Sequence, residues 1–568
     1  ANAGTSMLTF TGGANALDWQ TLDATGTSTT PITLMENGAG ISFGGTYDGA
    51  RSKINGDDTT EYNIDTENRT ASDTKVIAQS YQYRGVTAPV TPSGSTDVYG
   101  GISKVGNATR ENEITVSTGA YTDAFGGYTE VPSFGSGKAQ SSEKENSHDN
   151  KITIAGANVS GTVYGGYTTS TTGSATKNKV EVTSGTVNNI VGGYALGGAA
   201  SNNEITLKGG VTVGSVLGGQ GTTTTDNKVN LEGATVTGAV TGGSAGGTGH
   251  ELTVRNTNAA GSLVGFGKLK FDVGTAATNP MLTLTGGASA FDWQTLEAIG
   301  TTAGPVTLME NGAGISFSNY DGAHSGIDSA DTTEFNIDTE NRTASDNKVI
   351  AQSYQYRGQT NAVTSIGTDV YGGISRVANA TRENNITVSS GSYTNAYGGY
   401  TDSVPPLPGS DAKANSAEKN NSHDNTITIA GANVSGTVYG GYTNAAAGTA
   451  TKNTVNVTSG TVANVVGGSS AAGAASDNTI NLGAVTVTGN VTGGEGTATN
   501  DNKVNVEGTT VNGLISGGNN ATSGNTLTVK GTNSAGNITA FQHVNFDAST
   551  ANAGTSMLTF TGGANALD

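Results

Sequence analysis

The sequence predicts an all-β protein that folds as a parallel β-helix, a β-solenoid with coils of about 24–28 residues and loop insertions. Three observations predict this class: a long repeat that fills the chain, a strand motif that begins with Asn, and a Gly-Gly pair at a nearly fixed distance after each motif. In such a fold each coil buries its apolar side chains against its neighbours, so no wide globular core is needed. The periodicity of amphipathic helices is almost absent.

A long repeat organises the chain. Met7, Met281 and Met557 stand in matching contexts 274 and 276 residues apart, and Ala551–Asp568 repeats the first eighteen residues letter for letter. The predicted organisation is therefore repeat 1 over residues 1–274, repeat 2 over residues 275–550, and the start of repeat 3 over residues 551–568. Because repeats of this kind extend by stacking, we expect the sequence to be a window on a longer array.

The composition excludes several classes of protein. With 87 Gly and 9 Pro in 568 residues, and without Gly at every third position, the chain is not a collagen. Its 13% of charged residues is too low for a highly charged disordered chain. The 34% of hydrophobic residues is low but strongly patterned, which fits a narrow core inside an extended architecture.

Net charge and cysteine content narrow the partners and the sources of stability. A net charge of −19 argues against nucleic acid, because phosphate binding needs clustered Lys and Arg. The chain has no Cys, so neither disulfides nor thiolate metal sites can hold the fold. No apolar run approaches the roughly 18 residues of a membrane span, so no membrane-spanning segment is predicted in this window.

A short motif, Asn followed by two aliphatic residues at alternate positions, marks one strand of each coil. In repeat 1 it begins at Asn112, Asn150, Asn178, Asn203 and Asn227. The aliphatic pairs are Ile114/Val116, Ile152/Ile154, Val180/Val182, Ile205/Leu207 and Val229/Leu231, and in repeat 2 Ile386/Val388, Ile427/Ile429, Val455/Val457, Ile480/Leu482, Val504/Val506 and Leu527/Val529. A period of two is expected of a strand with one buried face, so these side chains are predicted to point inward.

A Gly-Gly pair follows each of these Asn residues after 14 or 15 positions. The pairs of repeat 1 are Gly126/Gly127, Gly165/Gly166, Gly192/Gly193, Gly218/Gly219 and Gly242/Gly243. Gly permits positive φ at corners and lets successive coils approach closely. Asn tolerates the left-handed region, and stacked Asn amides can form ladders along the axis.

The spacing of the Asn residues gives the size of one coil. From Asn150 onward, successive Asn residues are 28, 25 and 24 positions apart, which suits one turn of a parallel β-helix. Coils that stack at roughly 4.8 Å would form a rod on the order of 100 Å long.

The two Trp residues stand at equivalent places in the repeats. The stretch Ala16–Ala24 around Trp19, and its counterpart around Trp293, has the apolar spacing of a short helix or an irregular turn. We expect each Trp to fill a wide coil or the junction between repeats rather than to stack on a ligand.

Two insertions interrupt the coil rhythm in each repeat. The first, Glu130–Ser147 with its copy Asp402–Ser422, is rich in polar residues and is either a binding surface or a tolerated surface bulge.

The second insertion, Tyr47–Asp73, is acidic in both repeats. The residues that could hold a structural calcium ion are Asp57, Asp58, Asp65, Asp331 and Asp338. Hard cations bind several oxygen ligands from such clusters. Neither the EF-hand spacing nor the nonapeptide of calcium-binding β-rolls occurs, so the sequence favours a solvated acidic face and no bound cofactor.

Evidence for catalysis is poor, and no catalytic or cofactor-binding residue is assigned. His148 and His423 are the matched pair among five His residues, and both lie in Ser-His-Asp-Asn. Adjacency in sequence does not make a triad, because triad members come from separate segments. A surface turn is the simpler interpretation, and the chain is predicted not to be an enzyme.

The coil sequence, for example NKITIAGANVSGTVYGGYT at Asn150–Thr168 and NTVNVTSGTVANVVGG at Asn453–Gly468, resembles the Gly-rich passenger repeats of bacterial autotransporter and haemagglutinin-like adhesins. The resemblance covers most of both repeats. It implies a right-handed parallel β-helix, secretion across the outer membrane of a diderm bacterium, and an extracellular or cell-surface role in adhesion or as a stalk. Neither a signal peptide nor a translocator barrel is recognisable in this window.

Three functional hypotheses follow. The first is an extracellular, rod-like stalk or adhesin passenger whose partners are host or bacterial surface glycans or proteins. The second is a self-assembling filament or surface-layer subunit, whose partner is a further copy of itself. The third is a carbohydrate-active enzyme acting through carboxylates, which is disfavoured because an enzyme rarely needs its site copied in every long repeat.

Overall fold

The structure is a computed structural model that describes residues 5–563 apart from 25–27, 29, 45, 46, 93, 132–138, 140, 142, 245, 246, 276–279, 301, 303, 363–367, 404–417, 521 and 522. The insertions 130–147 and 402–422 therefore lie partly outside the described residues. The protein is all-β, with 59% strand and 2% helix, and its stacked parallel coils form a β-solenoid of about 20 turns. The predicted fold class is confirmed.

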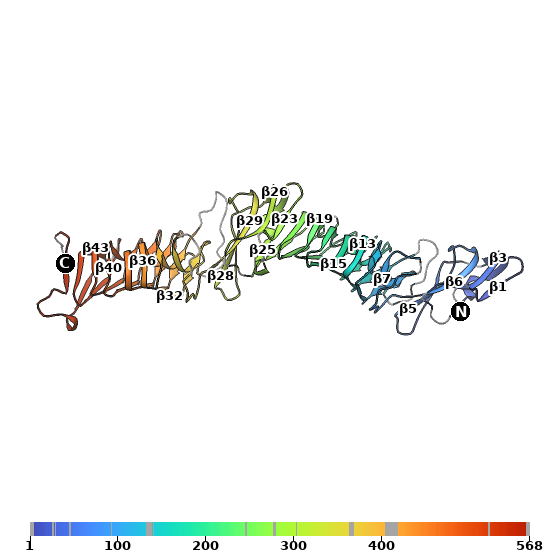
Figure 1. Ribbon diagram of the computed structural model, residues 1–568, viewed down its shortest axis with the longest axis horizontal. Coiled ribbons are helices and arrows are strands. Elements are labelled where there is room, and N and C mark those ends of the chain that lie inside the picture. The colour runs from blue at the N-terminus through green and yellow to red at the C-terminus, as the bar shows by residue number, and fades with distance from the viewer. Residues whose placement is uncertain are drawn as a thin grey trace. The chain divides into compact units, whose positions relative to one another are not determined.

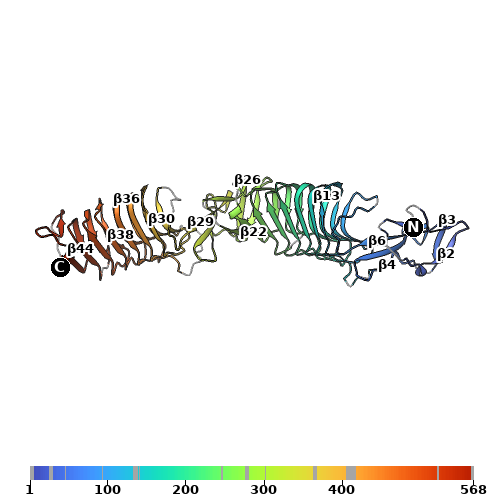
Figure 2. The same ribbon diagram turned by 60° about the horizontal axis from the view of Figure 1, so that its bottom comes forward.

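The chain divides into two compact units. The first contains residues 1–300 with 307–318 and 345–348, and the second contains residues 301–306, 319–344 and 349–568. The boundaries of the sequence repeats, at residues 274 and 550, stay a prediction. Within each unit, strands from successive coils lie side by side (Figures 1 and 2).

The first unit begins with a mixed sheet and continues as coils. The sheet contains β1 (Leu8–Phe10), β2 (Asn15–Asp18), β3 (Ile32–Gly44), β4 (Arg51–Ile54), β5 (Thr60–Thr66) and β6 (Ser72–Gln82). The coils contain β7 (Val98–Ser103), β8 (Thr109–Arg110), β9 (Glu113–Val116), β10 (Ala120–Tyr121), β11 (Ala124–Thr129), β12 (Ser147–His148), β13 (Lys151–Thr168), β14 (Ala175–Thr176), β15 (Lys179–Ala195), β16 (Glu204–Lys208), β17 (Thr212–Leu217), β18 (Lys228–Glu232), β19 (Thr235–Thr241), β20 (Glu251–Arg255), β21 (Asn258–Val264), β22 (Lys268–Asp272), β23 (Leu282–Leu284), β24 (Ser289–Asp292) and β25 (Leu296–Ile299).

The second unit repeats this order. Its strands are β27 (His324–Ile327), β28 (Thr333–Thr339), β30 (Val370–Ser375), β31 (Thr381–Arg382), β32 (Asn385–Val388), β33 (Ser392–Tyr393), β34 (Ala396–Thr401), β35 (Ser422–His423), β36 (Thr426–Thr443), β37 (Ala450–Thr451), β38 (Thr454–Ser470), β39 (Thr479–Leu482), β40 (Thr486–Val487), β41 (Val491–Glu495), β42 (Lys503–Glu507), β43 (Thr510–Ser516), β44 (Thr526–Lys530), β45 (Asn533–Thr539), β46 (His543–Asp547) and β47 (Leu558–Phe560). The strands β26 (Val306–Ser318) and β29 (Ser345–Gln355) contain residues of both units. The 3-10 helices are η1 (Trp19–Thr21), η2 (Val273–Thr275), η3 (Trp293–Thr295) and η4 (Ala548–Thr550).

The predicted core and coil length are confirmed. All the inward aliphatic residues of the Asn motif are buried, and Ile152 and Ile154 are 0% exposed. Ile152 lies opposite Val180, Val180 opposite Ile205, and Ile205 opposite Val229, so these coils contain 28, 25 and 24 residues. Every one of these pairings is parallel, as a β-solenoid requires.

The Asn residues that begin the motif form a buried ladder. Asn150 Nδ2 donates to Asn178 Oδ1 at 3.0 Å, and Asn178 Nδ2 donates to Asn203 Oδ1 at 3.2 Å. The same Nδ2 atoms also donate to backbone carbonyls of the preceding coil, and each Oδ1 also accepts a backbone N–H. The second unit has the same ladder through Asn384, Asn425, Asn453, Asn478 and Asn502. Both amide donors and the amide oxygen are thus satisfied in the core, which removes the cost of burying them.

The Gly-Gly pairs are required by close approach to this ladder. A Cβ at Gly166 would lie 2.3 Å from Asn178 Nδ2, and a Cβ at Gly192 would lie 2.3 Å from Gly218 O. None of these pairs has a positive φ, so close packing and not backbone conformation explains the Gly residues.

The left-handed position falls on the residue before each ladder Asn, which corrects the expectation that the Asn itself adopts it. These residues, with φ between 52° and 60°, are Glu111, Asp149, Lys177, Asn202, Asp226, Glu383, Asp424, Lys452, Asp477 and Asp501. The ladder fixes the Asn backbone N–H and side chain, so the reversal of direction occurs one residue earlier.

The acidic insertion is a set of antiparallel strands, which was not predicted. In the first unit β4 pairs with β5, and β5 pairs with β6, all antiparallel. The sequence Asn55-Gly-Asp-Asp58 supplies the first turn, with Asp58 at φ 56° and its N–H donating to Asn55 O. In the second unit β27, β28 and β29 repeat the pattern.

Trp19 fills the wide N-terminal coil, as expected. It lies in η1, is 0% exposed, and donates from Nε1 to Gly49 O at 3.0 Å. Asp18 caps the 3-10 turn by accepting from Gln20 N. Trp293 is equally buried in η3.

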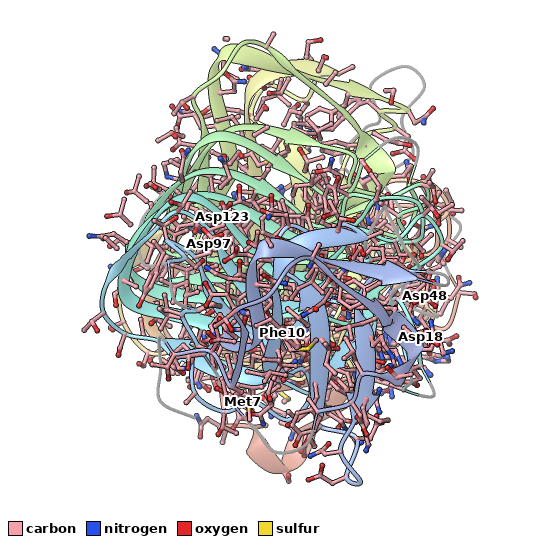
Figure 3. The ribbon with its side chains drawn as sticks, turned by 90° about the vertical axis from the view of Figure 1, so that its right-hand side faces the viewer. Met7, Phe10, Asp18, Asp48, Asp97 and Asp123 are labelled. Carbon is pink, nitrogen blue, oxygen red and sulfur yellow. The ribbon has the colours of Figure 1, made fainter. Side chains whose placement is uncertain are left out.

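One outer corner of the first unit is held by stacked carboxylates. Asp97 Oδ1 accepts from Asp123 N at 3.0 Å, and Asp123 Oδ1 accepts from Thr162 N at 2.7 Å. Asp97 and Asp123 are drawn close together in Figure 3. Each carboxylate thus links one coil to the next outside the core.

We predict that Gly192→Ala destabilises the coils around β15 and β17 by about 1–3 kcal/mol, because the new Cβ overlaps a backbone carbonyl that cannot move alone. Hydrogen exchange of the amides in these strands measures the change. Gly38→Ala is the control, because its Cβ would meet no atom within 4 Å. Equal protection in the two variants would contradict the role given to the Gly-Gly pair.

Candidate functional site

The densest group of buried charged side chains lies where the antiparallel strands meet the first coil of each unit. We call this place the hairpin junction. In the first unit it contains Asp58, Glu61, Tyr83, Ser103, Asn107 and Arg110, and in the second Asp331, Glu334, Tyr356, Ser375, Asn379 and Arg382. Because both copies are complete, the junction is the strongest candidate for a site that selection has kept.

Glu61 is the centre of the first junction and is 0% exposed. Its carboxylate accepts from Ser103 Oγ at 2.7 Å, from the Lys104 backbone N–H at 2.8 Å, from Asn107 Nδ2 at 2.8 Å and from Asn63 Nδ2 at 2.7 Å. Ser103 and Asn107 belong to the coil, whereas Glu61 belongs to β5. One side chain therefore fastens the hairpin to the solenoid.

Glu334 repeats this arrangement in the second unit. It accepts from Ser375 Oγ, the Arg376 N–H, Asn379 Nδ2 and Asn336 Nδ2 at 2.7, 2.7, 2.8 and 2.9 Å. Burial raises the pKa of both glutamates above the ordinary value, and the four hydrogen bonds oppose this without cancelling it.

A buried ion pair lies beside each glutamate. Arg110 Nη2 lies 2.6 Å from Asp58 Oδ2, and Tyr83 donates its hydroxyl to the other oxygen of Asp58. In the second unit Arg382 and Tyr356 contact Asp331 in the same way. Burial, followed by the hydrogen bond to aspartate, raises the pKa of both tyrosines, so they remain neutral donors.

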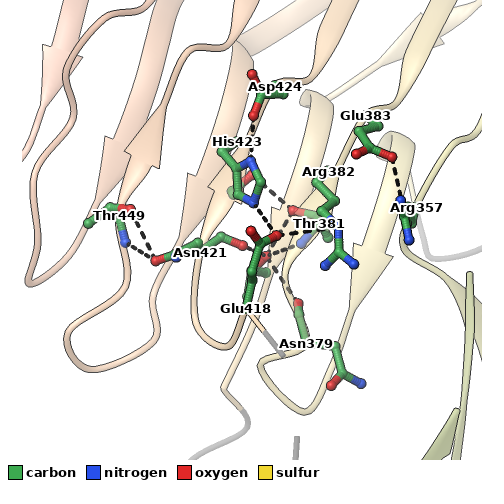
Figure 4. A network of polar contacts seen from close by, with 12 residues as sticks. Arg357, Asn379, Thr381, Arg382, Glu383, Glu418, Asn421, His423, Asp424 and Thr449 are labelled. Atoms are coloured by element: carbon green, nitrogen blue, oxygen red, sulfur yellow. Dashed lines mark hydrogen bonds and ion pairs between the residues drawn. The ribbon is translucent and has the colours of Figure 1, made fainter. Parts of the chain in front are cut away.

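The matched His residues lie at the outer edge of this network (Figure 4). His423 Nε2 lies 3.1 Å from Glu418 Oε2, and its Nδ1 lies 2.6 Å from Asp424 Oδ2. Ser422 points to the other side of β35, is fully buried, and donates to Gly399 O. The Ser-His-Asp-Asn sequence forms a short strand and not the expected surface turn, and its Ser and His side chains lie on opposite faces.

The five candidate calcium ligands are held by protein donors. Asp57 accepts from Thr59 Oγ1, Asp65 from Tyr47 OH at 2.6 Å, and Asp338 from Tyr320 OH at 2.7 Å. Asp58 and Asp331 pair with arginine at the hairpin junction. Among the residues described, no three His, Asp or Glu side chains converge as a metal site. Structural calcium stays a prediction.

A cavity of about 420 Å³ lies beside the second hairpin junction. Its lining includes Asn336, Asp338, Arg342, Arg376 and Asp402. Arg376 lies 2.6 Å from Asp402, and Arg342 lies 3.5 Å from Asp338. Because these charges neutralise one another, the cavity offers no unpaired charge for an ionic ligand.

Two columns of aromatic rings flank the Gly-Gly pairs on the outside of the coils. The stacked neighbours, with ring centroids 4.6–5.2 Å apart, are Tyr99, Phe125 and Tyr164; Tyr128, Tyr167 and Tyr194; Tyr371, Tyr397 and Tyr439; and Tyr400 and Tyr442. Burial raises the pKa of Tyr99 and Tyr167 to about 12. The aromatic residues beside each Gly-Gly pair were a readable signal, but only their inward neighbours were assigned a role from sequence.

No family model matches the chain, and neither a curated protein nor a solved structure matches it. Across the part of the chain that the structure describes, no helix has the length and apolar character needed to cross a membrane. The geometry is therefore the basis for any functional conclusion.

We predict that the double variant Glu61→Gln, Glu334→Gln loses a pH-dependent part of hairpin stability. With a raised pKa in the folded state, each glutamate contributes stability that is complete below its ordinary pKa of 4.5 and is lost as the pH rises through the folded value. Gln does not titrate, so the stability deficit of the variant should be largest in acid and should shrink toward neutral pH.

Hydrogen exchange of β5 and β28 amides, corrected for intrinsic rates, measures this difference. The pair Glu113→Gln, Glu507→Gln, taken from exposed strand positions, is the control and should show no such trend at the hairpins. A deficit that grows with pH would reverse the assigned direction.

Proposed function

We propose that the protein is an extracellular structural or adhesive protein, a rod-like surface stalk or adhesin passenger. The observation that carries the proposal is the continuous buried Asn ladder with its facing Gly-Gly pairs, present in both units. Such a core gives each coil the same contacts to its neighbours, so length can increase without a new design. Host or bacterial surface glycans or proteins are the proposed partners, and the surface of a diderm bacterium is the proposed location.

The hairpin junction supports a structural role better than a catalytic one. Its carboxylates are occupied by protein donors from two segments, and the Ser and His of the matched motif face opposite ways. Chemistry of the acid and base kind needs a group that can reach a substrate. We therefore propose a protein that is not an enzyme.

A direct test is to lengthen the chain by one further copy of repeat 2. Stacking at about 4.8 Å per coil predicts that negative-stain particles grow by roughly 50 Å for each added repeat of about ten coils. The same particles should remain separate at low concentration. Particles of unchanged length would contradict the stalk, and regular fibres from the unmodified chain would favour a self-assembling filament.

A further inference from the structure

A polar groove crosses the outer face of one sheet in the second unit. It runs over β36, β38, β39, β42 and β44, and its volume is about 530 Å³. Between its two buried aliphatic residues each strand turns one side chain outward. These half-buried residues are Thr428, Asn456, Asn481, Asn505 and Thr528.

The three asparagines form a second ladder, on the outside of the solenoid. Asn481 Nδ2 donates to Asn456 Oδ1, and Asn505 Nδ2 donates to Asn481 Oδ1, both at 2.8 Å. Asn456 Nδ2 donates to Thr428 Oγ1 at 3.2 Å. A primary amide has two N–H donors and two acceptor lone pairs. Unlike the buried ladder, this one leaves one donor and one lone pair of Asn481 available on the surface, and the pattern recurs along the groove.

Gly483 makes the groove deep at its middle. The row beside the amides contains Thr458, Gly483, Glu507 and Lys530 on successive strands. A Cβ at Gly483 would meet only Val457 O at 3.6 Å and Thr458 Cα at 3.8 Å, which is ordinary contact. The hollow therefore comes from the missing side chain, and a larger residue would fill it without displacing backbone.

The equivalent face of the first unit has no such hollow. Lys208 stands five residues after Asn203, as Gly483 stands five residues after Asn478. Its Nζ lies 2.7 Å from Glu181 Oε1, and Glu181 occupies the position of Asn456. An ion pair thus replaces the neutral amides and covers the row.

We infer that the groove of the second unit binds a linear polysaccharide of neutral hexoses that lies along the solenoid axis. Sugar hydroxyls both donate and accept hydrogen bonds, as the available groups of the outer amides do. Neighbouring strands repeat these groups every 4.7–4.9 Å, which is close to the length of one sugar in an extended chain.

Charge and shape favour this occupant over two others. The net charge of −19 repels anionic polysaccharides. The flat outer face of a second copy would leave the hollow at Gly483 empty. The inference names a partner class for the proposed surface protein and rests on that proposal for its biological setting only.

The test measures saturation-transfer NMR from the full chain to cellohexaose and, separately, to chitohexaose. No aromatic ring is among the described residues that line the groove, so binding should be weak and in fast exchange. The wild type should transfer saturation to at least one of the two hexasaccharides. Gly483→Leu and Asn481→Leu should each lower that signal about tenfold.

Lys208→Leu, at the equivalent position of the first unit, is the matched control and should leave the signal unchanged. Circular dichroism and the melting temperature show that each variant is folded. Absence of transfer to both hexasaccharides from the wild type, or a signal that survives Gly483→Leu, would overturn the inference. Microscopy of the lengthened chain tests the stalk separately, because filling the groove leaves the coil core unchanged.

Discussion

The buried Asn ladder is the interaction on which the coils depend. An amide inside an apolar core is costly unless all its donors and acceptors are used, and here the ladder and the backbone of adjacent coils use them. The Gly-Gly pairs follow from it, because any Cβ at Gly166 would strike the amide of Asn178. The left-handed residue before each Asn follows as well, since the chain must turn where the ladder has already fixed the next position.

The remaining interactions attach other elements to this core. Glu61 and Glu334 bring four donors onto one buried carboxylate and so hold an antiparallel hairpin against the first coil. The aromatic columns and the corner carboxylates add contacts between coils on the outside. These groups are polar or aromatic because they lie at junctions and surfaces, where aliphatic packing is incomplete.

The fold was readable from sequence because its causes are local and periodic. Ile152 and Ile154 alternate with polar residues, and Asn150 recurs at coil spacing, so burial and the ladder could be predicted. The hairpin β4–β5 was missed, although Asn55-Gly carries a turn signal, because the acidic composition of the insertion concealed its alternation. Glu61 could not be assigned, because its donors Ser103 and Asn107 are more than forty residues away. The groove at Gly483 depends on an absent side chain, which only the surrounding rows make visible.

The ladder also sets a rule for how such a gene can change. The Asn and its Gly-Gly pair stay 14 or 15 residues apart, whereas the coil length varies from 28 residues down to 24. The variable part lies after the Gly-Gly pair, on the side of the coil where Glu130–Ser147 is inserted. Recombination between similar coils that keeps the Asn-to-Gly spacing preserves the core, so whole coils can be gained or lost while the joints between them stay intact.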